Sequence, residues 1–134
     1  MSSKNHHFNN VVIASGPVII KNNKVLLNKH GEKDIWKFPG GDIYKKTGDL
    51  ETWAAKKVKE EMGLGVKIIK PLKPMVIWQE DEIIILIHYL AELINDDIKP
   101  ADYIKKYDWL DINNLPDDCA PNIKPVIEKY IASL

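Results

Sequence analysis

The chain has 134 residues, 45% of them hydrophobic and 28% charged, and its 19 basic residues balance its 19 acidic ones. This composition excludes a disordered chain, and the charge balance gives no reason to expect specific nucleic-acid binding or a membrane partner. One domain is expected at this length. All the basic residues are lysines, so a phosphate group must be held by lysine side chains, backbone amides or a metal ion.

The sequence also favours a particular compartment. Its single cysteine, Cys119, excludes an internal disulfide and favours a reducing environment. No apolar run reaches the ~18 residues of a membrane span, and the first ten residues are polar rather than signal-like. We therefore expect a cytoplasmic protein in which residues 1–9 form a flexible N-terminal tail.

The N-terminal part predicts a strand hairpin. Residues 10–21 are rich in β-branched side chains, and Gly16-Pro17 suggests a bulge or bend inside a long strand. Asn22-Asn23 predicts a hairpin turn into a second strand at residues 24–29.

A helix with marked ends follows a glycine corner. A short strand at residues 35–38 is expected to lead the chain into Gly40-Gly41. Asp49 is a good N-cap for a helix over residues 50–62, and Gly63 suits the left-handed conformation that ends a helix. The apolar stripe that should face the core consists of Ala54, Ala55, Val58 and Met62.

A second stripe of this helix carries charge. Lys57, Glu60 and Glu61 cluster near its C-terminal end, where we expect the two carboxylates to face away from the core. Carboxylates at this end oppose the helix dipole unless a cation compensates them, which suggests a metal ion. The alternative is a solvated charged face on which Lys57 pairs with Glu61.

The C-terminal half predicts more strands and a last helix. The strands are expected at residues 66–69, 75–78, 83–93 and 107–112, and the helix at residues 121–131. Residues 83–93 are apolar on both faces, which predicts a central strand covered by helices on each side. His88, within this run, is expected to be a hydrogen-bonded core residue rather than a ligand.

The glycine corner, the helix and its acids together resemble the signature of the Nudix hydrolases. Val58, Glu60, Glu61, Gly63 and Leu64 match that signature. Four features depart from it: Lys56 replaces its arginine, Lys57 replaces its first helix glutamate, its early glutamate falls on Gly48, and the loop after Gly41 is one residue longer. The resemblance extends more weakly over residues 10–131.

The resemblance implies a fold and an activity. The fold is a single α/β domain over residues 1–134, with a mixed β-sheet packed between helices in an α/β/α sandwich. The activity is the Mg²⁺-dependent, or Mn²⁺-dependent, hydrolysis of a diphosphate bond in a small nucleoside diphosphate derivative, weakened by the degenerate signature. The alternative is a catalytically impaired Nudix-like module that binds a nucleotide or a protein. The resemblance also suggests that the protein forms a homodimer.

The resemblance also assigns roles to residues. Glu60, Glu61 and the carbonyl group of Gly41 would hold the metal ion, and Gly40 and Gly41 would contact the substrate. Lys57 stands at a catalytic position, but a charged ammonium group neither ligates Mg²⁺ nor accepts a proton. The alternative bases are Glu60 itself, Glu80, Asp81, Glu82, Asp97 and Asp102. The aromatic residues that could stack on a nucleobase are Trp78, Tyr44 and Tyr103.

Overall fold

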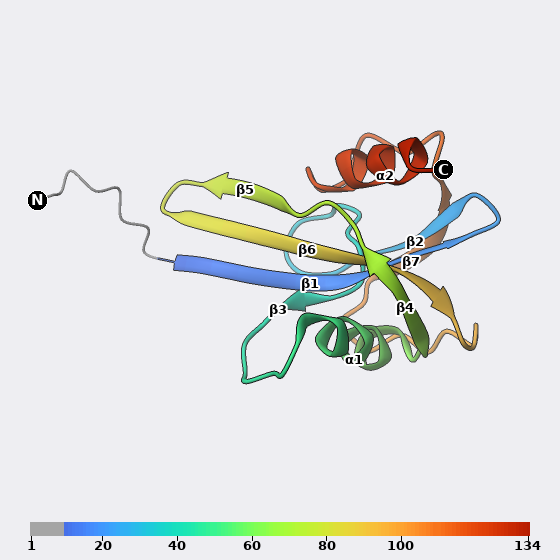
Figure 1. The fold of residues 1–134 in the computed structure, drawn as a ribbon, viewed down its shortest axis with the longest axis horizontal. Coiled ribbons are helices and arrows are strands. Elements are labelled where there is room, and N and C mark those ends of the chain that lie inside the picture. Colours follow the sequence, from blue (N-terminus) through green and yellow to red (C-terminus); the bar gives the residue numbers. More distant parts are fainter. Residues whose placement is uncertain (1–9) are drawn as a thin grey trace, which may run out of the picture.

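The computed structural model describes residues 10–134, so the tail expected at residues 1–9 lies outside the described residues. Its strands are β1 (Asn10–Lys21), β2 (Lys24–Lys29), β3 (Gly41–Asp42), β4 (Val66–Pro71), β5 (Met75–Gln79), β6 (Glu82–Leu93) and β7 (Lys106–Asp111). Its helices are α1 (Leu50–Met62) and α2 (Ile123–Ala132). The strands form one sheet in the order β4-β6-β1-β2-β7, with β3 beside β1 and β5 beside β6 (Figure 1).

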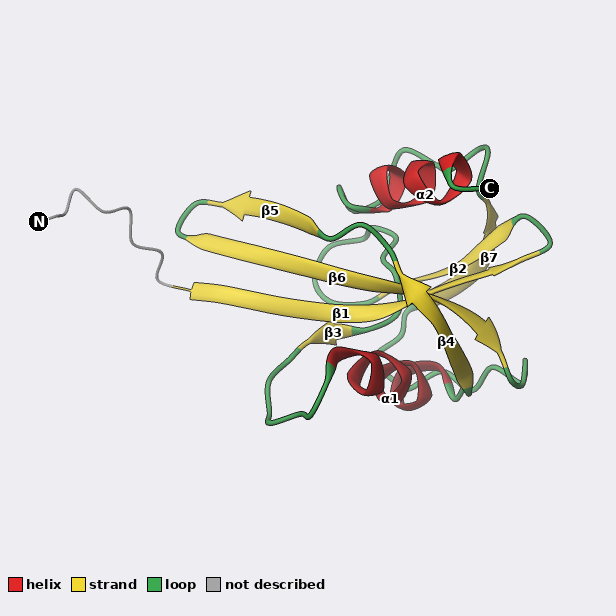
Figure 2. Ribbon diagram, viewed as in Figure 1, coloured by secondary structure: helices red, strands yellow, loops and turns green. Residues whose placement is uncertain are grey.

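The expected α/β/α sandwich is confirmed. β1 and β6 run parallel, whereas the other strand pairs are antiparallel, so the sheet is mixed. Figure 2 shows α1 and α2 on opposite sides of the sheet. Successive strand residues serve opposite faces: Val18 packs in the core cluster that holds residues of α2, and Ile19 packs in the cluster that holds residues of α1.

A bulge or bend was expected at Gly16 and Pro17, and no bulge forms there in the pairing of β1 with β6. The parallel register of β1 with β6 continues through both residues. Gly16 is needed for space instead, because a Cβ atom there would lie 1.9 Å from the carbonyl oxygen of Pro39. Pro17 is tolerated because β1 pairs with β3 only at residues 14–15 and with β2 only at residues 20–21, so that edge of the strand needs no amide donor at Pro17.

β6 is central, as expected, but the helices do not cover all of it. Its residues 83–87 are only half-buried, although each one is aliphatic. The first half of β6, the start of β1 and the end of β5 that leads into the turn to β6 extend beyond both helices (Figure 1). The expectation of a helix on each side therefore holds only for the second half of the strand.

Two other elements differ from expectation. Residues 35–38 are not a strand, because Trp36 and Lys37 make only isolated bridges, to Cys119 and Asn28. The last helix begins at Ile123 rather than at residue 121, with Asn122 as its N-cap. Within residues 10–134, no helix is long and apolar enough to cross a membrane.

Candidate functional site

Helix α1 is held at both ends by the predicted caps. The Asp49 Oδ1 atom accepts a hydrogen bond from the Thr52 amide at 2.7 Å, and Gly63 has φ = 72°. Val58 and Met62 are fully buried against the sheet. The helix therefore presents its C-terminal acids at a fixed place beside the sheet.

Glu61 lies beneath the glycine corner. The Glu61 Oε1 atom accepts hydrogen bonds from the Gly40 amide at 3.3 Å and from Asn28 Nδ2 at 3.1 Å. Only 2% of the residue is exposed, so the expectation that both carboxylates face away from the core is wrong for Glu61. Burial raises the pKa of Glu61 to about 7, although the two hydrogen bonds favour the ionised form.

Glu60 and Lys57 form an ion pair above this buried acid. The Lys57 Nζ atom lies 3.8 Å from Glu60 Oε2. The Lys57 side chain is only 14% exposed, against 41% for Glu60, and its Nζ lies over the rings of Tyr44 and Trp53 at 5.4 Å and 5.9 Å from their centres. The alternative interpretation expected Lys57 to pair with Glu61. The structure shows Lys57 paired with Glu60 instead.

The glycine corner is built by a close crossing of two backbones. Gly40 has φ = 124°, and a Cβ atom there would lie 2.5 Å from Gly16 Cα. This crossing turns the Gly40 amide toward Glu61. The carbonyl of the next residue, Gly41, accepts a hydrogen bond from Trp53 Nε1 at 3.3 Å, and Gly41 is paired with Ser15 of β1.

The chemical nature of these groups suits a divalent metal ion. The carboxylates of Glu60 and Glu61 and the Gly41 carbonyl are the hard oxygen donors that Mg²⁺ and Mn²⁺ prefer. Over residues 10–134, however, no cluster of three or more His, Cys, Asp or Glu side chains could hold a metal ion. Water and ligand oxygens would have to complete the coordination, with the Lys57 ammonium close by.

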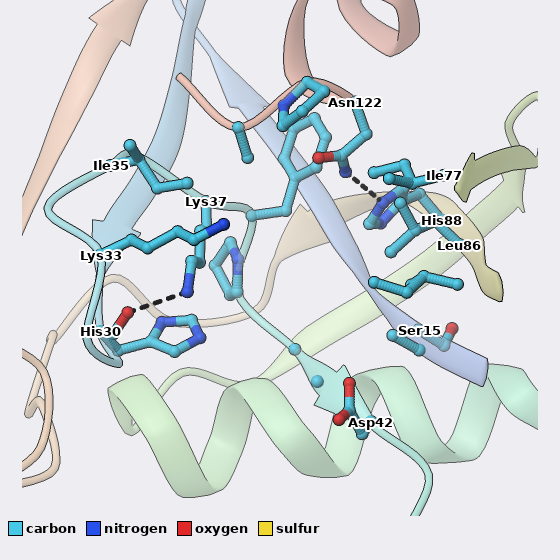
Figure 3. Close-up of a pocket in the computed structure, with 18 of the residues that line it drawn as sticks. Ser15, His30, Lys33, Ile35, Lys37, Asp42, Ile77, Leu86, His88 and Asn122 are labelled. Carbon is cyan, nitrogen blue, oxygen red and sulfur yellow. Dashed lines mark hydrogen bonds between the residues drawn. The ribbon is translucent and has the colours of Figure 1, made fainter. Parts of the chain in front are cut away.

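A pocket of about 450 Å³ opens beside the corner. Gly40 belongs to its lining and also donates to Glu61, which links the pocket to the acids. The apolar part of the lining comes from β1, β5, β6, the loop that leads into the corner and the segment before α2, namely Ala14, Ile35, Phe38, Pro39, Ile77, Ile84, Leu86, Ala120 and Pro121. Lys33, Lys37, His88 and Asn122 add polar groups (Figure 3).

Asn28 and His30 are site residues that sequence reasoning missed. Asn28 is fully buried and donates to Glu61 through its amide nitrogen, so its amide oxygen accepts from His30 Nδ1 at 2.6 Å. Burial and the nearby Lys37 and Lys57 lower the pKa of His30 to about 4. The one signal in the sequence was an asparagine directly after the apolar run of β2.

The predicted stacking residues lie outside the pocket. Ile77 lines the pocket, so its neighbour Trp78 points to the opposite face of β5, where it is 66% exposed. Tyr44 packs edge-on against Trp53, with ring centres 5.3 Å apart. Tyr103 belongs to the loop beside the C-terminal end of α1, and partial burial, followed by the charges of Glu61 and Glu60, raises its pKa.

The predicted alternative bases fall into two groups. Glu80, Asp81 and Glu82 lie at the β5–β6 turn, among the residues that line a separate depression. Asp97 and Asp102 lie on the loop that contacts the C-terminal end of α1, where the Ala101 amide donates to the Glu61 carbonyl at 2.8 Å. Asp97 pairs with Lys99 at 3.4 Å. Asp102 directly follows Ala101 in the chain. Among the candidate bases outside the helix, it is therefore the one next to a residue that contacts Glu61.

Comparison with known proteins decides the family. The family model of the NUDIX domain matches residues 12–130. The chain belongs to the Nudix family. Pyrophosphohydrolase activity on small nucleotide substrates and the use of a divalent metal ion are general in this family. No curated protein matches the chain closely enough to count as a relative.

Solved Nudix structures share the fold at low sequence identity. A MutT Nudix hydrolase from Burkholderia pseudomallei is 18% identical, with a TM-score of 0.80 over 89% of this chain and 97% of that one. A MutT protein from Methanosarcina mazei Go1 is 16% identical, with a TM-score of 0.80 over 92% and 95% of the two chains. An Ap4A hydrolase from C. elegans is 19% identical, with a TM-score of 0.77 over 91% and 96%. At these identities the likeness establishes the Nudix fold alone.

Proposed function

We propose that this Nudix protein hydrolyses a diphosphate bond in a nucleoside diphosphate derivative and that Lys57 slows the reaction. The observation that carries the proposal is Glu61, buried beneath the Gly40 amide at the edge of a pocket large enough for a small ligand. A buried carboxylate held by two hydrogen bonds is costly for the fold, and function is a reason to retain it.

Different residues of the chain have different roles in the proposed reaction. Lys33 and Lys37 line the pocket and attract the diphosphate in a protein without arginine. Glu60, Glu61 and the Gly41 carbonyl would hold Mg²⁺ or Mn²⁺, which when bound offsets phosphate charge and lowers the pKa of a coordinated water. Glu60 is the exposed carboxylate of the pair and, with Asp102, remains a candidate to accept the proton of the attacking water.

Lys57 weakens this arrangement through its charge. Its ammonium group occupies the neighbourhood of Glu60 that a divalent ion needs, and the two cations repel each other. We therefore expect slow Mg²⁺-dependent hydrolysis in the wild type and faster hydrolysis in Lys57→Glu. Lys59→Glu is the matched control, because it changes the same charge at an exposed position of the same helix turn.

The assay is phosphate or nucleotide release from a panel of nucleoside diphosphate derivatives, including nucleotide sugars, with and without Mg²⁺. A gain in Lys57→Glu that is absent in Lys59→Glu supports the role of Lys57. Ordinary turnover in the wild type, with no gain in Lys57→Glu, contradicts it.

The second candidate function is a binding module with impaired catalysis, which the Lys57–Glu60 ion pair favours. The Lys57 ammonium would supply part of the positive charge of a metal ion and bind phosphate without turnover. In that case the nucleotides of the panel raise the melting temperature of the wild type without being cleaved, and Lys57→Glu reduces this stabilisation.

Two further properties are proposals of the same kind. The single cysteine favours a cytoplasmic location. The exposed apolar side chains of Val11, Ile13 and Val76, on the part of the sheet beyond the helices, support a homodimer. Sedimentation velocity over a wide range of protein concentrations tests the dimer, and a monomer throughout contradicts it.

A further inference from the structure

A chain of three side chains connects the pocket lining to the buried acid of helix α1. His30 lines the pocket, and its Nδ1 atom lies 2.6 Å from Asn28 Oδ1. The Asn28 Nδ2 atom lies 3.1 Å from Glu61 Oε1. Asn28 is fully buried on β2, so its amide depends on these protein partners. Asn28 and His30 both precede the glycine corner and the helix that carry the Nudix signature.

The positions of the protons along this chain follow from the acid. A carboxylate that holds a metal ion is ionised and only accepts hydrogen bonds, so the Asn28 amide nitrogen must face Glu61. The amide oxygen then faces His30, whose Nδ1 must carry a proton. Burial, together with the charges of Lys37 and Lys57, lowers the pKa of His30 to about 4, so the ring is neutral at neutral pH. His30 therefore donates to Asn28, and Asn28 donates to Glu61.

The amide of Asn28 is held in one orientation. Its backbone exchanges two hydrogen bonds with the backbone of Lys37, at 2.9 Å and 2.8 Å. The Lys37 Nζ atom also donates to the His30 carbonyl at 2.9 Å, which fixes the other end of the chain (Figure 3). A reversed amide would place its oxygen against the Glu61 carboxylate and its hydrogens against the His30 Nδ1 proton. Both contacts would be repulsive, and burial of Asn28 leaves no solvent to relieve them.

Both hydrogen bonds of the Glu61 carboxylate end on the same oxygen. Asn28 Nδ2 and the Gly40 amide donate to Oε1. Over residues 10–134, no buried side-chain nitrogen or oxygen atom lacks a hydrogen-bond partner. Because neither hydrogen bond goes to Oε2, this atom must reach the surface of the site. Oε2 is therefore the oxygen left for a metal ion.

We propose that Asn28 is the positioning residue that directs Glu61 Oε2 toward a divalent metal ion, and that His30 holds the Asn28 amide in the required orientation. The proposal rests on the proposed function, in which Glu61 is a metal ligand. Without Asn28, only the Gly40 amide would hold the carboxylate, which could then rotate Oε2 away from the ion. Hydrogen-bond partners of metal ligands contribute roughly tenfold to hundredfold to metal affinity.

The test measures Mn²⁺ binding directly, because the electron paramagnetic resonance signal of the free ion disappears when the ion binds. The site concerned is the one that Glu61→Gln removes. Asn28→Leu has nearly the same size but no amide, and it should weaken this site roughly tenfold to hundredfold. His30→Phe keeps an aromatic ring but cannot donate to Asn28, so it should weaken the site by a smaller factor.

Met62→Leu is the matched control for packing. The Met62 Sδ atom lies 3.5 Å from Asn28 Nδ2. Replacing it changes the packing around the Asn28 amide but leaves the hydrogen bond to Glu61 in place. The Mn²⁺ affinity of Met62→Leu should therefore equal that of the wild type.

A second measurement determines where the His30 proton lies. Long-range proton–nitrogen correlation spectra of the histidine rings at neutral pH should place it on Nδ1 in the wild type, and the signals lost in His30→Phe identify the ring. In Asn28→Leu the acceptor is absent, so the preference for Nδ1 should be lost. Near-ultraviolet circular dichroism checks that each variant is folded. If Asn28→Leu does not fold, the His30→Phe affinity and the wild-type proton position decide the test.

A proton on Nε2 of His30 in the wild type, or equal Mn²⁺ affinity of Asn28→Leu and the wild type, overturns the inference and leaves the proposed hydrolysis intact. Equal affinity of His30→Phe and the wild type overturns the role of His30. A loss in Met62→Leu as large as that in Asn28→Leu overturns the role of the hydrogen bond, because packing would then be responsible. If Glu61→Gln removes no Mn²⁺ site, the proposed function fails together with the inference.

Discussion

Replacing Glu61 by glutamine tests whether a buried acid lies beneath the glycine corner. The ordinary pKa of glutamate is 4.5, and burial raises the pKa of Glu61 to about 7. At about 1.4 kcal/mol per pKa unit, the ionised side chain costs the folded protein about 3 kcal/mol. Glutamine still accepts the hydrogen bonds of Asn28 and Gly40 but carries no charge.

The pH dependence follows from the direction of the shift. Because the pKa is higher in the folded than in the unfolded chain, the stability contributed by the protonated acid is complete below pH 4.5 and is lost as the pH rises through 7. Glu61→Gln should therefore match the wild type near pH 4.5 and exceed its free energy of unfolding by about 3 kcal/mol at pH 8.

Urea unfolding followed by tryptophan fluorescence, without divalent ions and over this pH range, measures the difference. Glu60→Gln is the matched control, because its side chain is 41% exposed and should change stability by less than about 1 kcal/mol at every pH. A difference between Glu61→Gln and the wild type that is constant with pH would refute the account of Glu61. Added Mg²⁺ should raise the melting temperature of the wild type but not of Glu61→Gln, and equal Mg²⁺ titrations would remove Glu61 as a ligand.

Two further predictions concern the frame around the site. Asp49→Ala should lower the free energy of unfolding by about 1 kcal/mol through loss of the cap on α1, whereas Asp49→Asn keeps an acceptor for the Thr52 amide and should lose much less in the same urea titration. Gly16→Ala should destabilise the protein by about 3 kcal/mol or prevent folding, because its Cβ would meet the Pro39 carbonyl oxygen at 1.9 Å. Gly48→Ala is its control, since a Cβ there meets nothing within 4 Å, and equal thermal stability of the two variants would contradict the close crossing.

Helix α1 could be predicted from the sequence because its signals are local. The cap at Asp49, the left-handed Gly63 and the apolar stripe through Val58 all lie within or beside the helix, and the structure confirms each of them. The burial of Glu61 could not be predicted in this way. Its partners, Asn28 on β2 and Gly40 at the corner, are distant in sequence and meet it only when the sheet is formed.

The pocket could not be predicted from the sequence either, because its lining also depends on contacts between residues that are distant in sequence. His88 was recognised as a buried residue from the apolar run around it, which is a local signal. Its contact with Asn122 joins β6 to the start of α2 across 34 residues of sequence. The side of β5 on which Trp78 lies could not be predicted either, because it depends on the pairing of the strand: Ile77 lines the pocket, and Trp78 is 66% exposed on the other face.

The crossing of Gly16 and Gly40 connects the two halves of the site. On one side of the crossing the Gly40 amide donates to Glu61, and on the other the Gly16 carbonyl accepts from His88, which in turn orients Asn122. A side chain at either glycine would push these backbones apart and disturb both hydrogen bonds. The positions of the Glu61 carboxylate and of the His88 ring therefore depend on one backbone contact.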